Sequence, residues 1–342
     1  MGERTLEEIA ALIGADIVGD GKARVSGLGS LGTAVPGQLS HLSNPAYRHH
    51  LADTRATAVM LKPEDVDACP VNCLVTPNPY LSFARASQLF AVEEPADAGV
   101  HPRAVVDPSA SVDATASVGA NVVIGRDTVV AAGARILANS VVGDRCVIGE
   151  RVELRANVTL YSDVDIGADS IVHSGAVIGA DGFGFTPNET GEWQEIAQVG
   201  GVRIGRDVSI GANTCIDRGA IEHTVVEDGV KIDNHVQIGH NCHIGAHSLL
   251  CGQVGFAGST AIGRHCVFGG RSGAGGDHPV TICDNVMVSS CTVISQSVER
   301  PGIYSGSMLF HEHGKWRRNA LRMSSLDDLF KRVKRLEKKN AG

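Results

Sequence analysis

The sequence predicts a mainly β protein whose central part is a parallel β-solenoid. Three observations support this class. Aliphatic residues recur at every sixth position from Val106 to Ile294, with a few short slips. Glycine is abundant, with 41 residues, while aromatic residues make up only 4%, which suits many tight turns around thin aliphatic layers. The residues before about 100 and after about 305 lack the period, so they form separate units.

The six-residue period fits neither an α-helix nor a hairpin, and it is typical of hexapeptide solenoids in which each hexad forms one strand and one corner. The sequence contains 28 such positions, and three hexads make one coil, which predicts about nine coils. Glycine often follows the aliphatic residue, and we expect backbone torsions there to exclude a Cβ. These positions, all aliphatic except for two phenylalanines, are Val106, Val112, Val118, Ile124, Val130, Ile136, Val142, Ile148, Leu154, Leu160, Ile166, Val172, Ile178, Ile204, Ile210, Ile216, Val226, Ile232, Ile238, Ile244, Leu250, Phe256, Ile262, Phe268, Ala274, Ile282, Val288 and Ile294.

One long interruption of the period runs from residue 182 to residue 201. It carries Phe183, Phe185 and Trp193 in a sequence that has few aromatic residues. A loop of this length that leaves a regular solenoid is more often functional than idle. We therefore expect residues 182–201 to line a site.

Residues 1–100 predict a small α/β domain. Thr5-Leu6-Glu7-Glu8 has the pattern of a capping box that opens a helix with Ile9, Leu12 and Ile13 on its apolar face. Residues 56–61 and 72–76 are predicted as strands, and residues 81–90 as a helix.

Residues 306–342 are predicted to form a C-terminal helical extension. The helical pattern begins at Lys315 and includes an apolar stripe of Leu326, Leu329, Val333 and Leu336. From Lys315 the tail holds ten basic and three acidic residues, although the whole chain has a net charge of −8. A solvated helix face would explain this, but the asymmetry also suits an acidic protein partner. Nucleic acid is not expected, because interleaved aromatic residues and a recognised motif are missing.

The remaining composition favours a cytoplasmic protein. No apolar run approaches the roughly 18 residues of a membrane span, and the start of the chain lacks the apolar segment of a signal peptide. At most we expect a peripheral membrane contact.

His240 is the strongest candidate for chemistry. It follows Ile238-Gly239, so it lies beyond a corner and points outward instead of into the core. One coil of 18 residues later comes Gly258, and a further coil, with two inserted residues, leads to His278. A base, a free backbone N–H for an oxyanion and a second imidazole are the groups that acyl transfer needs. Asp233 could orient the imidazole of His240, although an exposed histidine without a role fits the same spacing.

Several motifs together resemble one known family. They are Asn44-Pro45-Ala46-Tyr47, Gly179-Ala180-Asp181-Gly182-Phe183-Gly184, Ile216-Asp217-Arg218-Gly219-Ala220, Ile232-Asp233-Asn234 and Ile238-Gly239-His240-Asn241. In this order, over almost the whole chain, they resemble the UDP-3-O-acylglucosamine N-acyltransferases of lipid A biosynthesis. The resemblance implies a left-handed parallel β-helix, a homotrimer with active sites between subunits, and transfer of a 3-hydroxyacyl group from acyl carrier protein to the amine of a UDP-sugar.

The resemblance also assigns roles by position. His240 matches the family's general base, Gly258 the oxyanion amide, and His278 a second imidazole near the thioester. Asn44 and Tyr47 match a uracil-binding pair, and His41 stands where the family usually has a phenylalanine that stacks on uracil. The resemblance implies that the C-terminal helices bind acyl carrier protein. It implies no metal and no cofactor beyond the phosphopantetheine thioester of that protein.

Three alternatives remain open. A γ-carbonic-anhydrase-like zinc enzyme uses the same solenoid, and His235 and His240 have a suggestive spacing, but a third ligand and a role for the first 100 residues are missing. An O-acyltransferase of the same pathway would lack the uracil-binding domain. A non-catalytic β-helical scaffold would bind an acidic partner through the basic tail, and it predicts no effect of His240→Ala.

Overall fold

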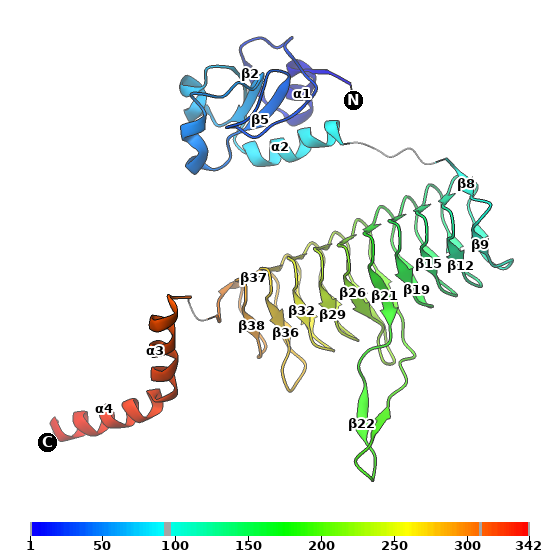
Figure 1. Cartoon of the computed structure of the whole chain (residues 1–342), viewed down its shortest axis with the longest axis vertical. Helices are drawn as coiled ribbons and strands as arrows, with labels where there is room; N and C mark the ends of the chain where they lie inside the picture. Colours follow the sequence, from blue (N-terminus) through cyan, green and yellow to red (C-terminus); the bar gives the residue numbers. More distant parts are fainter. Residues whose placement is uncertain (1, 92–96, 308–309, 341–342) are drawn as a thin grey trace. The chain divides into compact units, whose positions relative to one another are not determined.

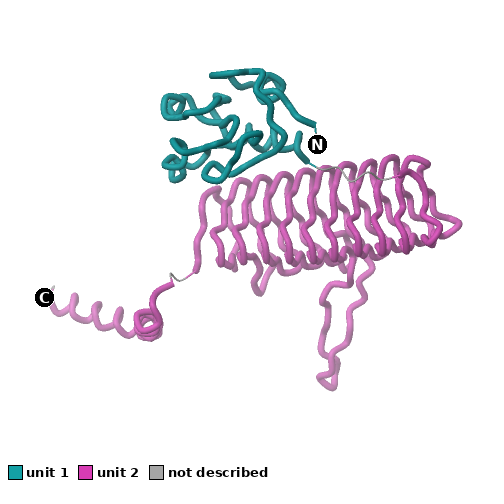
Figure 2. Tube along the Cα trace, turned by 45° about the horizontal axis from the view of Figure 1, so that its top comes forward, with its two compact units in different colours: residues 1–95 teal, residues 96–342 magenta. Residues whose placement is uncertain are grey.

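The computed structural model describes residues 2–91, 97–307 and 310–340. It divides into two compact units, Met1–Pro95 and Ala96–Gly342 (Figure 2). The division lies a few residues before the boundary expected at residue 100. The reason is that Gly99–Val100 already forms a strand that pairs with Ser117–Val118 of the second unit.

The first unit is a five-stranded mixed sheet with a two-stranded pair and two α-helices. The sheet order is β2 (Asp16–Val18), β7 (Asn72–Val75), β6 (Ala58–Leu61), β5 (Gln38–His41) and β4 (Gly27–Leu28), and β1 (Arg4–Thr5) pairs with β3 (Arg24–Val25). The helices are α1 (Leu6–Ile13) and α2 (Pro79–Ser87), and the unit also has three 3₁₀ turns, η1 (Pro45–His50), η2 (Pro63–Ala68) and η3 (Gln88–Phe90). The α/β character predicted for this region is present.

Helix α1 begins with the predicted capping box. The Glu8 N–H donates to Thr5 Oγ1, and the Thr5 N–H donates to Glu8 Oε2. Its buried face consists of Leu6, Ile9, Ala10 and Ile13, which are spaced three and four residues apart as one helix face requires. The expectation for Leu12 was wrong, because its position lies off this stripe and its side chain is 51% exposed.

The second unit is a parallel β-helix built from three sheets (Figure 1). We call them sheets I, II and III, in the order in which β10, β11 and β12 enter them along the chain. Sheet I contains β10 (Ser111–Val112), β13 (Val129–Val130), β16 (Val147–Ile148), β19 (Val164–Ile166), β24 (Val202–Ile204), β27 (Thr224–Val226), β30 (His243–Ile244), β33 (Ala261–Ile262) and β36 (Thr281–Ile282). Sheet II contains β8 (Gly99–Val100), β11 (Ser117–Val118), β14 (Arg135–Ile136), β17 (Glu153–Leu154), β20 (Ile171–Val172), β25 (Ser209–Ile210), β28 (Lys231–Ile232), β31 (Leu249–Leu250), β34 (Val267–Phe268), β37 (Val286–Val288) and β39 (Gly302–Tyr304). Sheet III contains β9 (Val105–Val106), β12 (Val123–Ile124), β15 (Val141–Val142), β18 (Thr159–Leu160), β21 (Val177–Ala180), β26 (Cys215–Asp217), β29 (Gln237–Ile238), β32 (Gly255–Phe256), β35 (Gly273–Ala274) and β38 (Val293–Ile294).

Every predicted aliphatic position lies in one of these strands, and almost all of their side chains are buried in one continuous core. Only Val106, Val112 and Ile294, in the end coils, are half-buried. Sheets of nine, eleven and ten strands give about ten coils instead of nine. The additional strands are β8, whose Val100 lies one hexad before Val106, and β39, which lies outside the hexad.

Gly179 has the expected positive φ angle, of 86°, but most of the glycines that follow the aliphatic residues are needed for another reason. Gly125 and Gly143 do not have positive φ angles; the left-handed residues come two positions later, at Asp127 and Arg145. Instead, a Cβ on Gly143 would lie 2.6 Å from the Ser162 nitrogen of the next coil. Close stacking of coils, and not a special torsion, therefore excludes a side chain there.

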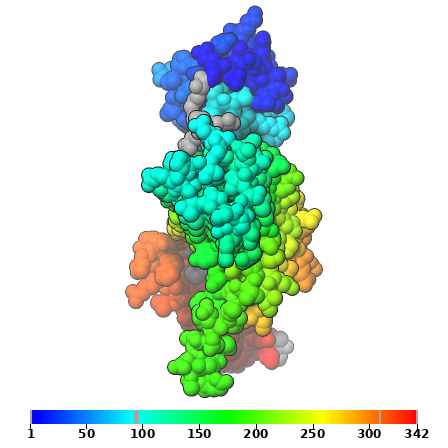
Figure 3. All heavy atoms as spheres, turned by 90° about the vertical axis from the view of Figure 1, so that its right-hand side faces the viewer, coloured from blue at the N-terminus to red at the C-terminus, as the bar shows by residue number. Residues whose placement is uncertain are grey.

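Chain segments that leave the β-helix do so mainly where sheet III turns into sheet I, which we call the III–I corner. The longest is a hairpin formed by β22 (Phe185–Pro187) and β23 (Trp193–Glu195), and a shorter loop precedes β36. Figure 1 shows both on the same side of the β-helix, and the space-filling view in Figure 3 shows the hairpin, in green, protruding beyond the coils.

The C-terminal extension forms two helices, α3 (His313–Ser324) and α4 (Leu326–Asn340). The predicted stripe lies on α4, where Leu326, Leu329, Val333 and Leu336 are all exposed. Residues 341–342 lie outside the described range. Among the described helices, none is long and apolar enough to cross a lipid bilayer.

Candidate active site at the III–I corner

His240 lies at the III–I corner, directly after β29, as predicted. Its ring is enclosed by two glycines. A Cβ on Gly258 would lie 2.5 Å from His240 Nε2, and a Cβ on Gly182 would lie 2.5 Å from His240 Cβ. Gly258 follows β32, which pairs with β29 so that Gln237 faces Gly255. The predicted stacking of His240 and Gly258 on successive coils is therefore confirmed.

The backbone at Gly258 is free for a ligand. Within the described part of the chain, no acceptor is seen for the Gly258 N–H, although its neighbours Ala257 and Ser259 donate to Ala274 and His240 carbonyls. Because Gly258 has no Cβ, the imidazole packs directly against its backbone. A base and an unpaired backbone donor thus lie next to each other, which is the arrangement that an acyl-transfer site requires.

His278 does not lie directly on the next coil below Gly258. The register of β32 with β35 pairs Phe256 with Ala274, so the stacked residue is Gly276. The two inserted residues place His278 farther along the exposed loop before β36. His278 shares the III–I corner with His240, but it belongs to a projecting segment and not to the coil itself.

Asp233 lies at a different corner. It follows β28 of sheet II, whereas His240 follows β29 of sheet III. Its carboxylate accepts a hydrogen bond from the Asn234 N–H. Within one chain Asp233 therefore does not orient His240, because strand β29 separates the two corners. His235 shares the corner of Asp233, so the spacing that suggested a zinc pair does not bring His235 to His240.

A different carboxylate, Asp217, lies near His240. Asp217 ends β26, which pairs with β29 in sheet III, and its Oδ2 accepts a hydrogen bond from Gln237 Nε2 at 3.0 Å. Burial raises the pKa of Asp217, while the Gln237 hydrogen bond and the positive charge that His240 can carry oppose the shift. A negative charge at Asp217 would therefore stabilise a protonated imidazole.

Asn241 is the direct polar partner of His240. His240 Nδ1 lies 3.1 Å from Asn241 Oδ1, which also accepts the Ala220 N–H at 2.9 Å. The Asn241 N–H in turn donates to Thr224 Oγ1 at 2.8 Å. Sequence reasoning missed both Asp217 and Asn241, although each belongs to a motif that carried the family resemblance.

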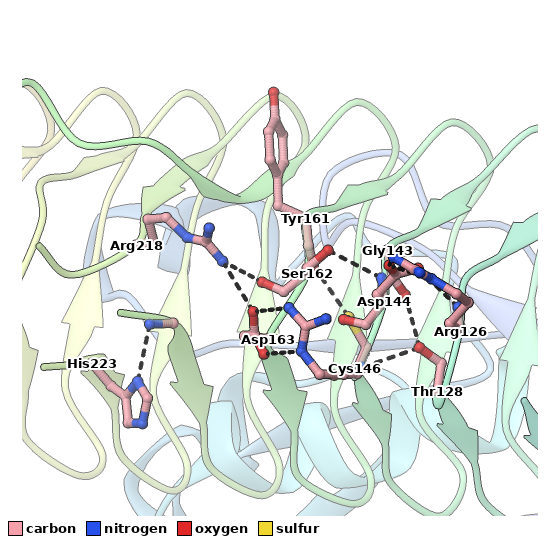
Figure 4. Close-up of polar contacts among 12 residues, drawn as sticks. Arg126, Thr128, Gly143, Asp144, Cys146, Tyr161, Ser162, Asp163, Arg218 and His223 are labelled. Atoms are coloured by element: carbon pink, nitrogen blue, oxygen red, sulfur yellow. Dashed lines mark hydrogen bonds and ion pairs between the residues drawn. The ribbon is translucent and has the colours of Figure 1, made fainter. Parts of the chain in front are cut away.

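A ladder of charged side chains along the III–I corner supports the start of the loop 218–223 (Figure 4). Arg126 Nη2 pairs with Asp144 Oδ2 at 2.7 Å, and the Asp144 N–H donates to Ser162 Oγ. Arg218, whose side chain is only 14% exposed, donates to the Ser162 carbonyl and lies 3.7 Å from Asp163. The hydrogen bond from Arg126 holds the pKa of Asp144 below its usual range. Arg218 is thereby fixed at the corner.

The loop 218–223 is also tied to the hairpin segment. The Val199 N–H donates to the Ala220 carbonyl, and the Gly200 N–H donates to the Gly219 carbonyl. The Gly201 N–H donates to His223 Nδ1 at 3.0 Å, a contact that Figure 4 shows. The base of the loop 182–201 thus contacts the site, since Gly182 packs on His240. Beyond the base, Phe183 and Trp193 are largely exposed.

The three predicted nucleotide residues line one cavity of about 450 Å³ in the first unit. His41 ends β5, Asn44 caps η1 by accepting the Ala46 N–H, and Tyr47 lies on η1. His41 stacks on Phe83 with ring centroids 4.0 Å apart, and burial lowers its pKa. Tyr80 of α2 also lines this cavity. Its place there could not be predicted from sequence, because almost forty residues separate the end of β5 from the start of α2.

Polar atoms at this cavity lack partners. Among the described residues, His41 Nδ1 and Ser43 Oγ are buried without a hydrogen bond. Buried polar groups of this kind are rare unless a ligand or water satisfies them. The cavity therefore offers aromatic faces together with unpaired donors and acceptors, as a planar heterocycle would need. Elsewhere in the described chain, no group of three or more His, Cys, Asp or Glu side chains is placed to hold a metal ion.

The chain matches several known protein families. Residues 22–89 match the family profile of UDP-3-O-(3-hydroxymyristoyl) glucosamine N-acyltransferase, and residues 145–180 and 259–296 match hexapeptide-repeat profiles of bacterial transferases and of succinyl-transferase. The solved UDP-N-acetylglucosamine acyltransferase of Francisella novicida is 21% identical, with a TM-score of 0.45 over 68% of this chain and 79% of that chain.

Close relatives cover nearly the full length. The UDP-3-O-acylglucosamine N-acyltransferase of Hahella chejuensis is 50% identical, over 97% of this chain and 95% of its own. The enzyme of Albidiferax ferrireducens is 50% identical over 98% of this chain and 96% of its own. The enzyme of Herminiimonas arsenicoxydans is 46% identical over 97% of this chain and 96% of its own. With this identity over whole chains, and with its β-helix and corner histidine, the chain belongs to the UDP-3-O-acylglucosamine N-acyltransferase family.

Proposed function

We propose that the protein transfers a 3-hydroxyacyl group from acyl carrier protein to the 2-amino group of UDP-3-O-(3-hydroxyacyl)glucosamine, a step of lipid A biosynthesis that gives a UDP-2,3-diacylglucosamine. The observation that carries the proposal is the packing of His240 Nε2 against Gly258, whose N–H has no acceptor within the described chain. The family supports the substrate class.

In the proposed reaction the neutral amine attacks the thioester carbonyl, and the C–N bond forms. His240 Nε2 accepts the proton that the amine loses, while the Gly258 N–H donates to the oxyanion of the tetrahedral intermediate. Collapse of the intermediate breaks the C–S bond and releases the phosphopantetheine thiol, which takes up a proton. Positioning of the amine contributes most, and the base adds about 10²- to 10⁴-fold.

The cavity of the first unit would hold the uracil. Tyr47 and Tyr80 offer aromatic faces, while Asn44 and Ser43 offer polar atoms at the cavity wall. His41 would replace the usual phenylalanine as a stacking surface, and its contact with Phe83 fixes the ring plane. This arrangement supports recognition of a flat pyrimidine through stacking and a few hydrogen bonds.

The extension α3–α4 would bind acyl carrier protein. Helix α4 exposes an apolar stripe beside basic residues that include Lys334, Arg335 and Lys338. An acidic protein with an apolar patch complements such a surface, and electrostatic attraction would mainly speed association. With such a donor, the reaction would take place in the cytoplasm.

A homotrimer is supported by the outer face of sheet III. Val105, Val123 and Val141 point outward and are exposed in the single chain, and Gly255 and Gly273 continue the same face with small residues. A neighbouring subunit could approach this face closely and cover the site at its edge.

The proposal is tested by incubating the purified enzyme with a radiolabelled 3-hydroxyacyl group on acyl carrier protein and UDP-3-O-acylglucosamine. We expect an amide-linked, base-stable product and no transfer to UDP-N-acetylglucosamine, which has no free amine. Acylation of a hydroxyl group of UDP-N-acetylglucosamine would overturn the N-acyl assignment.

A further inference from the structure

The hydrogen bonds around Asn241 fix which atom of its side chain faces His240. The Ala220 N–H lies 2.9 Å from Asn241 Oδ1, and a backbone N–H can only donate. At the other end of the same amide, Asn241 Nδ2 lies 3.5 Å from the Glu222 carbonyl, which can only accept. Both contacts require the same orientation of the amide. The atom near His240 is therefore the oxygen.

This orientation decides where the imidazole carries its proton. His240 Nδ1 lies 3.1 Å from Asn241 Oδ1, and an amide oxygen cannot donate. Nδ1 must then be the donor, so the neutral ring has its lone pair on Nε2. Nε2 is the atom that faces Gly258, where a Cβ would lie 2.5 Å away.

We infer that Asn241 is a positioning residue that selects the Nδ1–H tautomer of His240, so that Nε2 is free to accept a proton from the substrate amine. The inference rests on the proposed role of His240 as base and adds the group that prepares it. In catalytic triads a carboxylate holds the imidazole in the same way. Here a neutral amide does so, and its own orientation is set by the loop 218–223.

The same contacts connect the base to the hairpin segment. Ala220 donates its N–H to Asn241, and its carbonyl accepts the Val199 N–H. The Asn241 N–H is held by Thr224 Oγ1 at the end of the same loop. The loop 218–223 and the residue that follows it, Thr224, therefore hold Asn241 from both sides.

The test combines kinetics with a direct measurement of the tautomer. Asn241→Ala should lower kcat about 10- to 100-fold with KM within about threefold, because the ring loses the acceptor that holds its Nδ1 proton. Asn241→Asp keeps an acceptor for both Ala220 and His240 and should retain most of the activity. Asn234→Ala is the matched control: its Oδ1 accepts the Ala212 N–H at 2.6 Å at another corner, without touching the imidazole, and the variant should stay within about threefold of wild type.

The tautomer is read by ¹⁵N NMR of protein labelled in histidine, with the His240 signals identified by their loss in His240→Gln. We expect a protonated Nδ1 and an unprotonated Nε2 in the wild type, and a gain of the Nε2–H form in Asn241→Ala. A wild-type ring protonated on Nε2, or full activity of Asn241→Ala when His240→Gln is inactive, would overturn the inference alone. An active His240→Gln would instead overturn the base assignment.

Discussion

His240 and Gly258 lie so close that a single methyl group on Gly258 would meet the imidazole, with a Cβ only 2.5 Å from His240 Nε2. We therefore expect Gly258→Ala to displace the ring and to lower kcat by about 10² or more, while the β-helix remains folded. Steady-state kinetics and circular dichroism measure the two effects.

Gly270→Ala is the matched control for this prediction. Gly270 follows sheet II at another corner, and the nearest atom to its Cβ would be 3.5 Å away, an ordinary contact. Its activity and melting temperature should equal those of the wild type. A Gly258→Ala enzyme that is as active as Gly270→Ala would show that the two residues do not share a reaction site.

Asp217→Asn should separate stability from activity. Burial raises the pKa of Asp217 in the folded state. The folded state therefore loses stability as the pH rises through that pKa and the carboxyl group ionises. Below the ordinary carboxyl pKa of about 4 there is no such loss, because the group is protonated in both states. The variant should thus melt at a higher temperature than the wild type at pH 7, and the difference should shrink in acid.

The same substitution removes a negative charge near His240, so kcat/KM should fall about 3- to 10-fold. Thermal melts at pH 4 to 8 and initial rates at pH 7 test both parts. A variant that melts lower at pH 7 and keeps full activity would contradict this role of Asp217.

His41→Phe should strengthen nucleotide binding. The phenyl ring offers a larger stacking surface and leaves no unpaired Nδ1 in the cavity wall, so we expect about 3- to 10-fold tighter binding of UDP by isothermal titration calorimetry. His49→Phe, outside the residues that line the cavity, is the control. Weaker binding by His41→Phe would mean that Nδ1 forms a hydrogen bond to the nucleotide.

Charge reversal on α4 tests the binding of acyl carrier protein. The double variant Lys334→Glu and Lys338→Glu should raise KM for acyl carrier protein about tenfold at low salt, with less effect at high salt and little change in kcat. Lys22→Glu with Lys62→Glu makes the same charge change on the first unit. Equal effects of both pairs would show only a dependence on net charge.

The repeat could be predicted from sequence because each hexad encodes its own strand and corner. The aliphatic residue of each hexad, such as Ile238 or Ile244, points inward in every coil. The core residues could therefore be predicted from the local sequence, without knowledge of which coils are neighbours. The position of Gly258 one coil after His240 followed from the same local rule, since no residue is inserted between them.

The partners of His240 could not be predicted in the same way. The loop 218–223 lengthens its coil, so that Cys215 of β26 pairs with Gln237 of β29, 22 residues later. A count of 18 residues per coil therefore does not bring Asp217 next to His240. Proximity in sequence favoured Asp233 instead, which the turn at Asn234 places at another corner. Insertions also moved His278 from the coil into a loop. The omission of Asp217 and the misplacement of His278 both arose where the repeat is interrupted.

The central claim is that the imidazole of His240 accepts the amine proton. The most direct measurement is single-turnover transfer of a labelled 3-hydroxyacyl group from acyl carrier protein to UDP-3-O-acylglucosamine by wild type and by folded His240→Ala of the same assembly state. The account predicts a rate constant lower by about 10² or more, with nucleotide binding unchanged. An unaltered rate constant in the variant would contradict it.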